Sequence, residues 1–337
     1  MSNRPARSGR KARHAKAAAP PRINPAAPGQ RGGFYRPLNE IDCQNIYDTA
    51  LRLLEELGMG EVPDRLRADL LAAGATDKGA RIGLPRTLVE NCIDTAPKTF
   101  PLHGRDPNRT IEVGGKKVYF GTGGAAVNTL DRDTGLYRPS TLADLHDFTR
   151  LQDALDNVAW FTRCCIATDM EDEWLLDVNT AHALMANTTK PVAMAFTLAH
   201  HVAPLVEMFN IASDGAFAKT PFVKAHISPV ISPMRYGEDA VDVTYECLAH
   251  DVPVSCITAA QAGATAPATL AGMLAMSLAE TLASLVMVNV VKPGHPMVFS
   301  NWPFVIDLRT GAFAGGGGET TVLNAASAQL SNWLGLP

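Results

Sequence analysis

The sequence has no C-x-x-C pair, no regular spacing among its cysteines, and no apolar stretch typical of a signal peptide at its start. In a chain of 337 residues, six irregularly placed cysteines are typical of reduced thiols rather than of a disulfide framework. The lack of an apolar signal argues against export. We therefore expect a cytoplasmic protein with free thiols at Cys43, Cys92, Cys164, Cys165, Cys247 and Cys256.

Acidic residues are absent from positions 1–33, which carry eight Lys or Arg side chains. This stretch is rich in Ala and Pro and has too little apolar surface to fold, so we expect a disordered basic tail over residues 1–33. The remainder carries 22 basic and 34 acidic side chains, a balance of −12, although the whole chain carries only −4. An acidic globular part gives no support for nucleic acid as a partner.

Two glycine clusters and one histidine pair lack the companions that a phosphate or metal site needs. Gly121-Thr122-Gly123-Gly124 has no lysine and opens no clear helix, so a tight turn is favoured over a phosphate cradle. The run from Gly315 to Gly318 is expected to lead flexibly into the last helix. No carboxylate or thiol stands at helical ligand spacing from His200-His201, so we expect no metal site.

Charge is also scarce in residues 266–291, where Glu280 is the single charged residue. The stretch is long enough to span a bilayer. However, Glu280 would lie near its middle with three hydroxyl side chains beside it, and an ionised group there costs roughly 2.5 kcal/mol or more. The stretch also lies between two expected strands. A buried crossover helix is therefore favoured over a membrane span.

Apolar residues make up 46% of the chain, and five strands are expected in its second half at intervals of 30 to 43 residues. Strands that alternate with helices at this spacing indicate parallel βα units. A run of such units most often closes as a TIM (β/α)8-type barrel, which needs three more. We therefore expect an α/β fold: a barrel over residues 141–337, apparently truncated after about five βα units, with a helical and short-strand N-terminal region over 34–140 packed on it. The strands should begin near Val158, Pro191, Pro221, Pro253 and Pro296.

The third expected strand shows which way the sheet faces. Its alternating residues put one apolar and one polar set on opposite faces, and helices cover the outside of such a sheet. The polar set, Lys224, His226 and Ser228, should therefore point into the barrel. Polar residues also stand near the ends of the other strands, at the carboxyl face where barrel enzymes have their sites.

One loop and several scattered motifs carry a family resemblance. The stretch Gln261–Gly272 leaves the fourth strand, breaks with glycine and starts a helix at Pro267. It resembles the corresponding loop of the trimethylamine methyltransferase family, the corrinoid-dependent methylamine and betaine methyltransferases. The resemblance covers residues 34–337 and the N-terminal two thirds of the family's proteins. Its further motifs, in family order, are Asp131…Thr134-Gly135…Arg138-Pro139-Ser140-Thr141, Ser228-Pro229…Ser232-Pro233, Glu280, Lys292-Pro293-Gly294 and Ala328-Gln329-Leu330…Gly335-Leu336-Pro337.

The resemblance implies an enzyme that moves a methyl group from a methylated amine, such as trimethylamine or glycine betaine, to Co(I) of a corrinoid protein. It implies no covalently bound cofactor, because the cobalamin (corrinoid) is carried by that partner protein. The expected partners are thus a corrinoid protein and a small methylated amine, with no nucleic acid and no membrane; a homo-oligomer is left open. Some family members use pyrrolysine, at a position in the strand expected after Pro337.

Residue types suggest how such a substrate would be held. A quaternary ammonium binds well to aromatic faces, at about 0.5–2 kcal/mol each, so Tyr119, Phe196 and Trp302 are the expected wall. The candidates to bind a carboxylate or to orient the substrate are His226, Ser228, Gln261 and Asn301. No catalytic residue is assigned.

Two other interpretations stay open. A barrel lysine with a lowered pKa can form a Schiff base, so Lys224 allows a lyase or aldolase. The chain is alternatively a non-catalytic remnant, whose unpaired strand edges would need a partner to cover them. Because the strands beyond the fifth should supply part of the pocket, we expect impaired activity in this chain alone.

Overall fold

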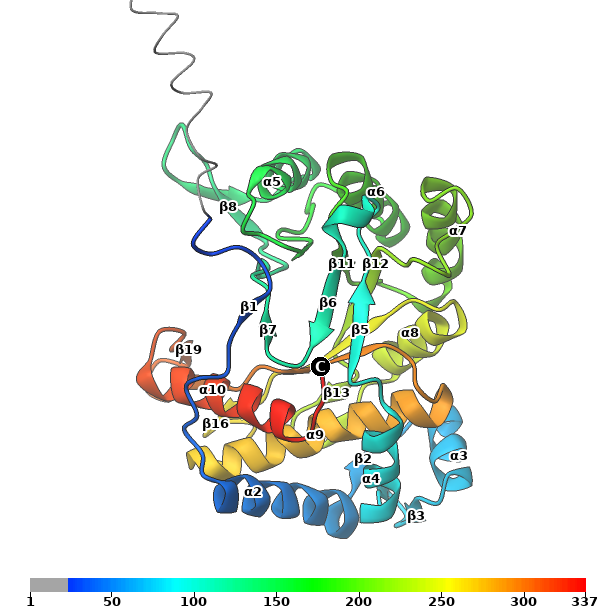
Figure 1. Cartoon of the computed structure of the whole chain (residues 1–337), viewed down its shortest axis with the longest axis vertical. Helices are drawn as coiled ribbons and strands as arrows, with labels where there is room; N and C mark the ends of the chain where they lie inside the picture. The colour runs from blue at the N-terminus through cyan, green and yellow to red at the C-terminus, as the bar shows by residue number, and fades with distance from the viewer. Residues whose placement is uncertain (1–23) are drawn as a thin grey trace, which may run out of the picture.

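A five-stranded parallel sheet forms the centre of the computed structural model, which describes residues 24–337 (Figure 1). The strands lie in the order of the chain, and every neighbouring pair is parallel. The five predicted strands and the α/β class are thereby confirmed. The strands are β10 (Phe161–Thr162), β11 (Val192–Met194), β12 (Val223–Ile227), β15 (Val254–Thr258) and β17 (Met297–Asn301).

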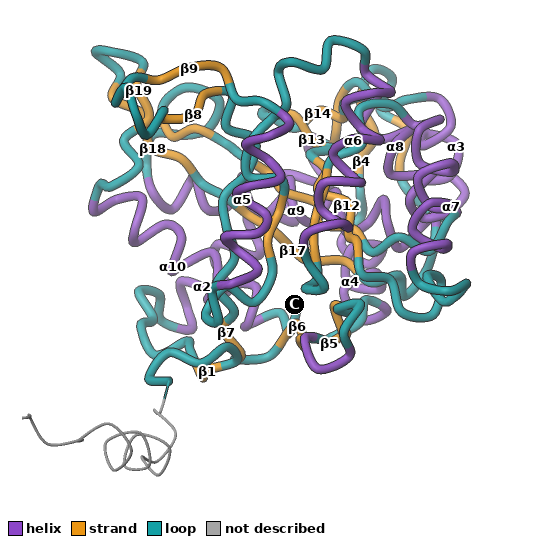
Figure 2. Tube along the Cα trace, turned by 90° about the horizontal axis from the view of Figure 1, so that it is seen from above, coloured by secondary structure: helices purple, strands orange, loops and turns teal. Residues whose placement is uncertain are grey.

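Each strand is followed by a helix, and the first four of these helices bring the chain back to start the next strand. Viewed from above, β12 and β17 lie in the middle of the molecule, with α7 and α10 on opposite sides (Figure 2). The helices are α6 (Glu173–Asn187), α7 (Val202–Ala212, after the short η3, Ala199–His201), α8 (Glu238–Ala249), α9 (Leu270–Val291) and α10 (Gly318–Trp333).

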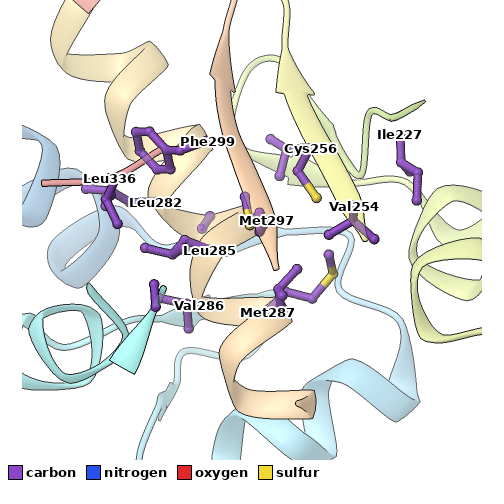
Figure 3. Close-up of a cluster of buried hydrophobic side chains, with 14 of the residues drawn as sticks. Ile227, Val254, Cys256, Leu282, Leu285, Val286, Met287, Met297, Phe299 and Leu336 are labelled. Carbon is purple, nitrogen blue, oxygen red and sulfur yellow. The ribbon is translucent and has the colours of Figure 1, made fainter. Parts of the chain in front are cut away.

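The outer face of the sheet is apolar and packs on the helices. Ile227, Cys256 and Phe299 point into the same cluster as Leu282 and Leu285 of α9 (Figure 3). Because side chains alternate along a strand, the neighbours of these residues face the other way. The predicted polar inner face, with Lys224 and His226, follows from this packing.

The amino-terminal half of the inner face is covered by a hairpin, which we call the floor. It consists of β5 (Thr99–Leu102) and β6 (Ile111–Gly114), which pair antiparallel. Phe100 and Leu102 pack with Ala159, next to β10, and against Val298 of β17. The packing cluster of the floor contains no residue from the carboxyl ends of these strands.

The sheet extends by one more parallel segment, residues 120–126, which includes the Gly121-Thr122-Gly123-Gly124 stretch that was expected to form a tight turn. Phe120 and Ala126 form parallel bridges to Val158 and Cys165 along the free edge of β10. The segment is followed by the hairpin of β8 (Asn128–Leu130) and β9 (Tyr137–Pro139) and then by α5 (Leu142–Ala154), which packs on α6. Residues 120–154 therefore repeat the strand-and-helix pattern before the first predicted strand.

The helices of the N-terminal region pack on α9. Both α2 and α4 lie against α9, and so does α3. The short strands β2, β3 and β4 join β13 and β14 in a second, mixed sheet. The elements are α2 (Glu40–Arg52), η1 (Leu53–Leu57), α3 (Asp64–Ala72), α4 (Arg86–Thr95), β2 (Met59–Gly60), β3 (Thr76–Asp77), β4 (Arg81–Gly83), β13 (Val230–Ile231) and β14 (Arg235–Tyr236).

Most of the predicted basic tail, residues 1–23, lies outside the described residues. Its last part contains β1 (Gln30–Arg31), which pairs antiparallel with β7 (Lys117–Val118). The remaining short elements are η2 (Pro107–Arg109), β16 (Gln261–Ala262), β18 (Phe304–Asp307) and β19 (Ala312–Phe313). All six cysteines are free.

Helix α9 is the buried crossover that the sequence predicted between the fourth and fifth strands. It is long and apolar enough to cross a bilayer, but 89% of its most apolar window is buried inside the protein. Its carboxylate, Glu280, is fully buried and accepts hydrogen bonds from Ser232 Oγ at 2.7 Å and from the Met234 backbone N–H at 2.9 Å. These two hydrogen bonds therefore hold the loop after β12 against α9.

Glu280 gives a stability prediction with a pH signature. Burial, opposed by its two hydrogen bonds, raises the pKa of Glu280. The contribution of Glu280 to the free energy of unfolding is therefore complete below the ordinary pKa of Glu, and it is lost as pH rises through the raised pKa. Glu280→Gln keeps an acceptor for Met234 and cannot ionise, so its stability relative to wild type should rise with pH over that interval. Glu280→Leu should lower the free energy of unfolding by about 1–3 kcal/mol, because the Met234 N–H loses its partner.

Urea unfolding between pH 4 and pH 8, followed by circular dichroism, measures both effects. A constant difference in the free energy of unfolding between Glu280→Gln and wild type across this pH range would contradict the raised pKa of Glu280.

Candidate active site

The inner face of the sheet carries two rows of residues set by the strand register. Thr162, Ala193 and Lys224 stand side by side across β10, β11 and β12. Nearer the carboxyl ends, His226 stands beside Ser255. The Ser255 hydroxyl lies 3.0 Å from that of Ser300 on β17. Lys224 and His226 are therefore the charged and titratable groups of this face on β12.

Lys224 is buried with no carboxylate partner among residues 24–337. Its side chain is 4% exposed, and its Nζ lies 4.4 Å from the centroid of the Trp160 ring. Burial alone lowers the pKa of Lys224 to about 8. The indole face compensates a buried ammonium only in part, since a desolvated cation–π contact contributes about 2 kcal/mol.

His226 lies in the field of two cations. Burial, followed by the charges of Lys224 and Arg163, lowers the pKa of His226 to about 4. The imidazole is therefore neutral at physiological pH. Its Nδ1 is buried and has no hydrogen-bond partner among the described residues. A neutral imidazole with a free ring nitrogen offers one donor or acceptor to a ligand, depending on the tautomer.

Arg163 follows β10 and is the second cation near His226, and its side chain is partly buried. Burial lowers the pKa of Arg163, and the charge of Asp177 on α6 opposes that shift. One of its terminal nitrogens, Nη1, is buried without a hydrogen-bond partner among the described residues.

The Asp177 carboxylate is occupied by other donors. It accepts hydrogen bonds from the Thr197 backbone N–H and hydroxyl, both at 2.7 Å, and it lies 2.9 Å from His201 Nδ1. Asp177 therefore holds the turn after β11 and faces Arg163 without forming an ion pair with it.

Three of the predicted site residues come together beyond β15 and β17. The Trp302 backbone N–H donates to the Thr258 carbonyl, and the Thr258 hydroxyl lies 3.4 Å from Asn301 Oδ1. Gln261 of β16 pairs in register with Phe304 of β18. Trp302 is 45% exposed. The centroid of its ring lies 4.3 Å from that of the Phe304 ring, and the Phe304 centroid lies 4.8 Å from that of Phe313. We call these three rings, at this end of the sheet, the aromatic trio.

The predicted aromatic wall of Tyr119, Phe196 and Trp302 is distributed over three places. Tyr119 packs against the floor and lines a cavity of about 690 Å³ with Tyr35 and Trp333, beside β7 and α10. Phe196 is buried in the main hydrophobic core. Neither ring lies in the cluster of Trp302. The chain places Phe304 and Phe313 beside Trp302 instead.

Ser228 also lies apart from the other predicted residues. It is exposed, and it lines a shallow cavity of about 740 Å³ with Ile231 and Tyr236. His226, two positions earlier on the same strand, remains on the inner face. The described residues contain no group of three or more His, Cys, Asp or Glu side chains arranged to hold a metal ion.

The whole described chain matches one known protein family. The family profile of the trimethylamine methyltransferases (MTTB) matches residues 6–337. The chain belongs to this family.

Curated relatives of this trimethylamine methyltransferase family member include enzymes for two substrates. The trimethylamine methyltransferase MttB of Desulfitobacterium hafniense is 27% identical over 301 residues, covering 87% of this chain and 59% of that protein. The glycine betaine methyltransferase of the same species is 26% identical over 311 residues, covering 92% and 64%. MttB of Methanosarcina barkeri is 27% identical over 269 residues, covering 76% and 53%. The chain thus spans 53% to 64% of the length of these relatives.

The fold is also similar to that of a solved enzyme. The monomethylamine methyltransferase MtmB of Methanosarcina barkeri superposes with a TM-score of 0.57 at 13% sequence identity, covering 90% of this chain and 61% of that chain. At this identity the similarity shows the α/β fold.

Several residues of the candidate site could not be predicted from the sequence. Arg163 stood at the end of the first expected strand, so its position was the available signal. Nothing local in the sequence pointed to Asp177, whose partners lie 20 and 24 residues further along the chain. Phe304 and Phe313 were missed because no strand was expected between the fifth strand and the last helix, where β18 and β19 form a hairpin.

Proposed function

We propose that the protein transfers a methyl group from a methylated amine to Co(I) of a separate corrinoid protein, with its site at the carboxyl ends of the parallel strands. The observation that carries this proposal is the family match over residues 6–337. The polar inner face and the aromatic trio support the location, because active sites of parallel βα folds lie at the carboxyl ends of their strands.

We further propose that the sheet is part of a TIM-type barrel. At each step a backbone N–H in or beside one strand donates to the carbonyl of the residue just before the next strand: Val192 to Phe222, Ala225 to Pro253, and Val254 to Pro296. Phe299 of β17 donates in the same way to Pro337, at 2.8 Å. This repeat supports a further parallel strand beyond Pro337, and the segment 120–126 supplies an additional one at the opposite edge.

The chemistry explains what the chain's residues must do. A corrinoid partner would supply Co(I) as the nucleophile for the methyl carbon, and the electron pair of the broken C–N bond would leave with the nitrogen. The nitrogen must carry a positive charge beforehand, because a neutral amine leaves poorly. The aromatic trio can stabilise that ammonium by about 0.5–2 kcal/mol per ring. Gln261 and Asn301 stand beside the trio as hydrogen-bonding groups that can orient the substrate.

A second candidate function rests on Lys224. Its burial and its pKa of about 8 are properties of a Schiff-base lysine. The protein would then be a lyase that forms an imine with a carbonyl substrate. The test is borohydride reduction in the presence of small aldehydes and ketones, followed by mass spectrometry. A lyase would become covalently modified at Lys224, whereas a methyltransferase would keep Lys224 unmodified.

Methyl transfer is tested by mixing the chain with reduced corrinoid and a panel of methylated amines. The result expected is a decrease in Co(I) absorbance that requires both the chain and a methylated amine. An unchanged absorbance with every amine, combined with borohydride trapping at Lys224, favours the lyase.

Trp302 gives a prediction about substrate binding. Trp302→Ala should raise the dissociation constant for a methylated ammonium severalfold, because one aromatic face of the trio is lost. Trp333→Ala is the matched control, since Trp333 packs on Tyr47, outside the trio. Isothermal titration calorimetry measures both. Equal dissociation constants for Trp302→Ala and wild type would remove this ring from the site.

A further inference from the structure

Two neighbouring cysteines follow the first strand of the sheet and have no role in the proposed methyl transfer. Cys164 and Cys165 come just after β10, where Cys165 forms a parallel bridge to Ala126. Both belong to a small apolar cluster with Leu145 of α5. Cys165 is 2% exposed, whereas Cys164 is only partly buried. The cluster therefore holds two thiols together, one of which solvent can reach.

The two thiols differ in reactivity from each other and from the remaining cysteines. A hydrogen bond from the Cys165 thiol holds the pKa of Cys164 below its ordinary value, against the effect of burial. The same hydrogen bond, followed by burial, raises the pKa of Cys165. Burial also raises the pKa of the four other thiols, Cys43, Cys92, Cys247 and Cys256. Because the thiolate is the nucleophile in cysteine chemistry, Cys164 is the reactive member of the pair.

A buried amide beside Cys164 has an unused acceptor. Gln152 of α5 is 9% exposed, and its side chain hydrogen-bonds Cys164. The Gln152 Oε1 atom is buried without a hydrogen-bond partner among residues 24–337. Buried polar atoms are normally paired, so this oxygen fits a donor that comes from outside the described chain. The hydroxyl of a hydroperoxide is such a donor, and so is that of a sulfenic acid formed on Cys164.

The backbone around the pair makes a bond between the two sulfur atoms reversible. Adjacent Cα atoms lie about 3.8 Å apart, below the roughly 4.4–6.8 Å that disulfides usually span, so a disulfide between neighbours is strained and easily reduced. The Cys164 carbonyl accepts from the Ala126 N–H at 3.1 Å, and the Ala126 carbonyl accepts from the Ile166 N–H at 2.9 Å. These hydrogen bonds flank the peptide that joins the cysteines. Strain in that peptide would therefore loosen the segment 120–126 from the edge of the sheet.

We propose that Cys164 and Cys165 form a dithiol that hydroperoxides oxidise reversibly, a modification site that does not depend on the proposed methyl transfer. The Cys164 thiolate attacks one oxygen of the hydroperoxide, the O–O bond breaks, and hydroxide or alkoxide leaves. The Cys165 thiol then attacks the sulfenic acid at Cys164: the S–S bond forms, the S–O bond breaks, and water leaves with the Cys165 proton. The pair is oxidised by two electrons, and an external dithiol reduces it again.

The test is oxidation of the 337-residue chain by a small excess of hydrogen peroxide at neutral pH. Free thiols are then alkylated, and the digest is analysed by mass spectrometry without reduction. The peptide that contains Cys164 and Cys165 should lose two hydrogen atoms and regain them with dithiothreitol, while the other four cysteines are recovered as alkylated thiols. Without peroxide, iodoacetamide should modify Cys164 of the folded protein at least tenfold faster than any other thiol.

Three variants separate the roles of the two thiols. Cys165→Ser should stop the reaction at the sulfenic acid, which dimedone traps on Cys164. Cys164→Ser should give neither the disulfide nor the dimedone adduct. Cys92→Ala, at a buried thiol outside the pair, is the matched control and should oxidise as wild type does. Thermal unfolding of the reduced variants shows whether each has kept its fold.

Hydrogen exchange measures the effect of oxidation on the neighbouring segment. In oxidised wild type, the amides of Ala126 and Ile166 should exchange at least tenfold faster than in the reduced protein. The Val254 amide, which donates to the Pro296 carbonyl elsewhere in the sheet, is the internal control and should not change. Unchanged exchange at Ala126 and Ile166 would contradict the strain on the peptide between the cysteines.

Other outcomes would overturn the dithiol itself. Oxidation of any of the four other thiols before Cys164 would place the reactive site elsewhere. A dimedone adduct on Cys164 of wild type, without a disulfide, would remove Cys165 from the reaction. A disulfide between two chains, seen by non-reducing gel electrophoresis, would exclude the bond between neighbours. None of these measurements involves a methylated amine, so their failure would leave the proposed methyl transfer untouched.

Discussion

Replacing Asp177 with alanine should lower the free energy of unfolding by about 3–5 kcal/mol, the range for breaking a buried charged contact. Asp177 is completely buried, and it accepts hydrogen bonds from the Thr197 N–H and hydroxyl while contacting His201. Alanine would leave these donors without an acceptor. It would also remove the negative charge that faces Arg163.

The matched control is Glu173→Ala on the exposed first turn of the same helix, which should change stability by less than about 0.5 kcal/mol. Urea unfolding at neutral pH compares the two variants. A loss below about 1 kcal/mol for Asp177→Ala would show that this network does not hold the turn after β11.

Replacing Gly121 with alanine should destabilise the protein by about 1–3 kcal/mol through overpacking. A Cβ at Gly121 would lie 2.4 Å from the Trp160 ring. The Trp160 indole is rigid and contacts the Lys224 ammonium, so it cannot move away from the new Cβ without disturbing the inner face. The segment 120–126 thus needs glycine to lie close to the edge of β10.

Gly123→Ala provides the control two positions away, since a Cβ there would meet nothing within 4 Å. Thermal unfolding of both variants is the measurement, and the control should unfold near the wild-type temperature. Equal stability of the two variants would contradict the close packing of this segment on β10.

Much of the fold was predictable because its signals are local. The capping box of Thr141 and Asp144 starts α5, and that of Asn39 and Asp42 starts α2; both are signals contained within a few residues of the sequence. The alternation along β12 assigned Lys224 and His226 to the inner face before the packing was known. The burial of α9 followed from a polar group that a bilayer would not accept.

The missed features depend on contacts between distant residues. The segment 120–126 resembled a turn because Gly121, Gly123 and Gly124 have low strand propensity. Its strand-like pairing comes from residues of the β10 region more than thirty positions later. Phe196 has the chemistry of a ligand-binding ring, yet the main hydrophobic core buries it. Composition and spacing therefore predicted where the strands and helices lie better than which aromatic rings stand together.

The fate of the methyl group tests the proposed function most directly. Glycine betaine with deuterated N-methyl groups is incubated with the chain and reduced corrinoid, and both products are analysed by mass spectrometry. Methyl transfer predicts a trideuterated methyl group on the corrinoid and dimethylglycine that retains the other two labelled methyl groups. Unlabelled corrinoid together with intact betaine, under conditions where betaine binds, would contradict it.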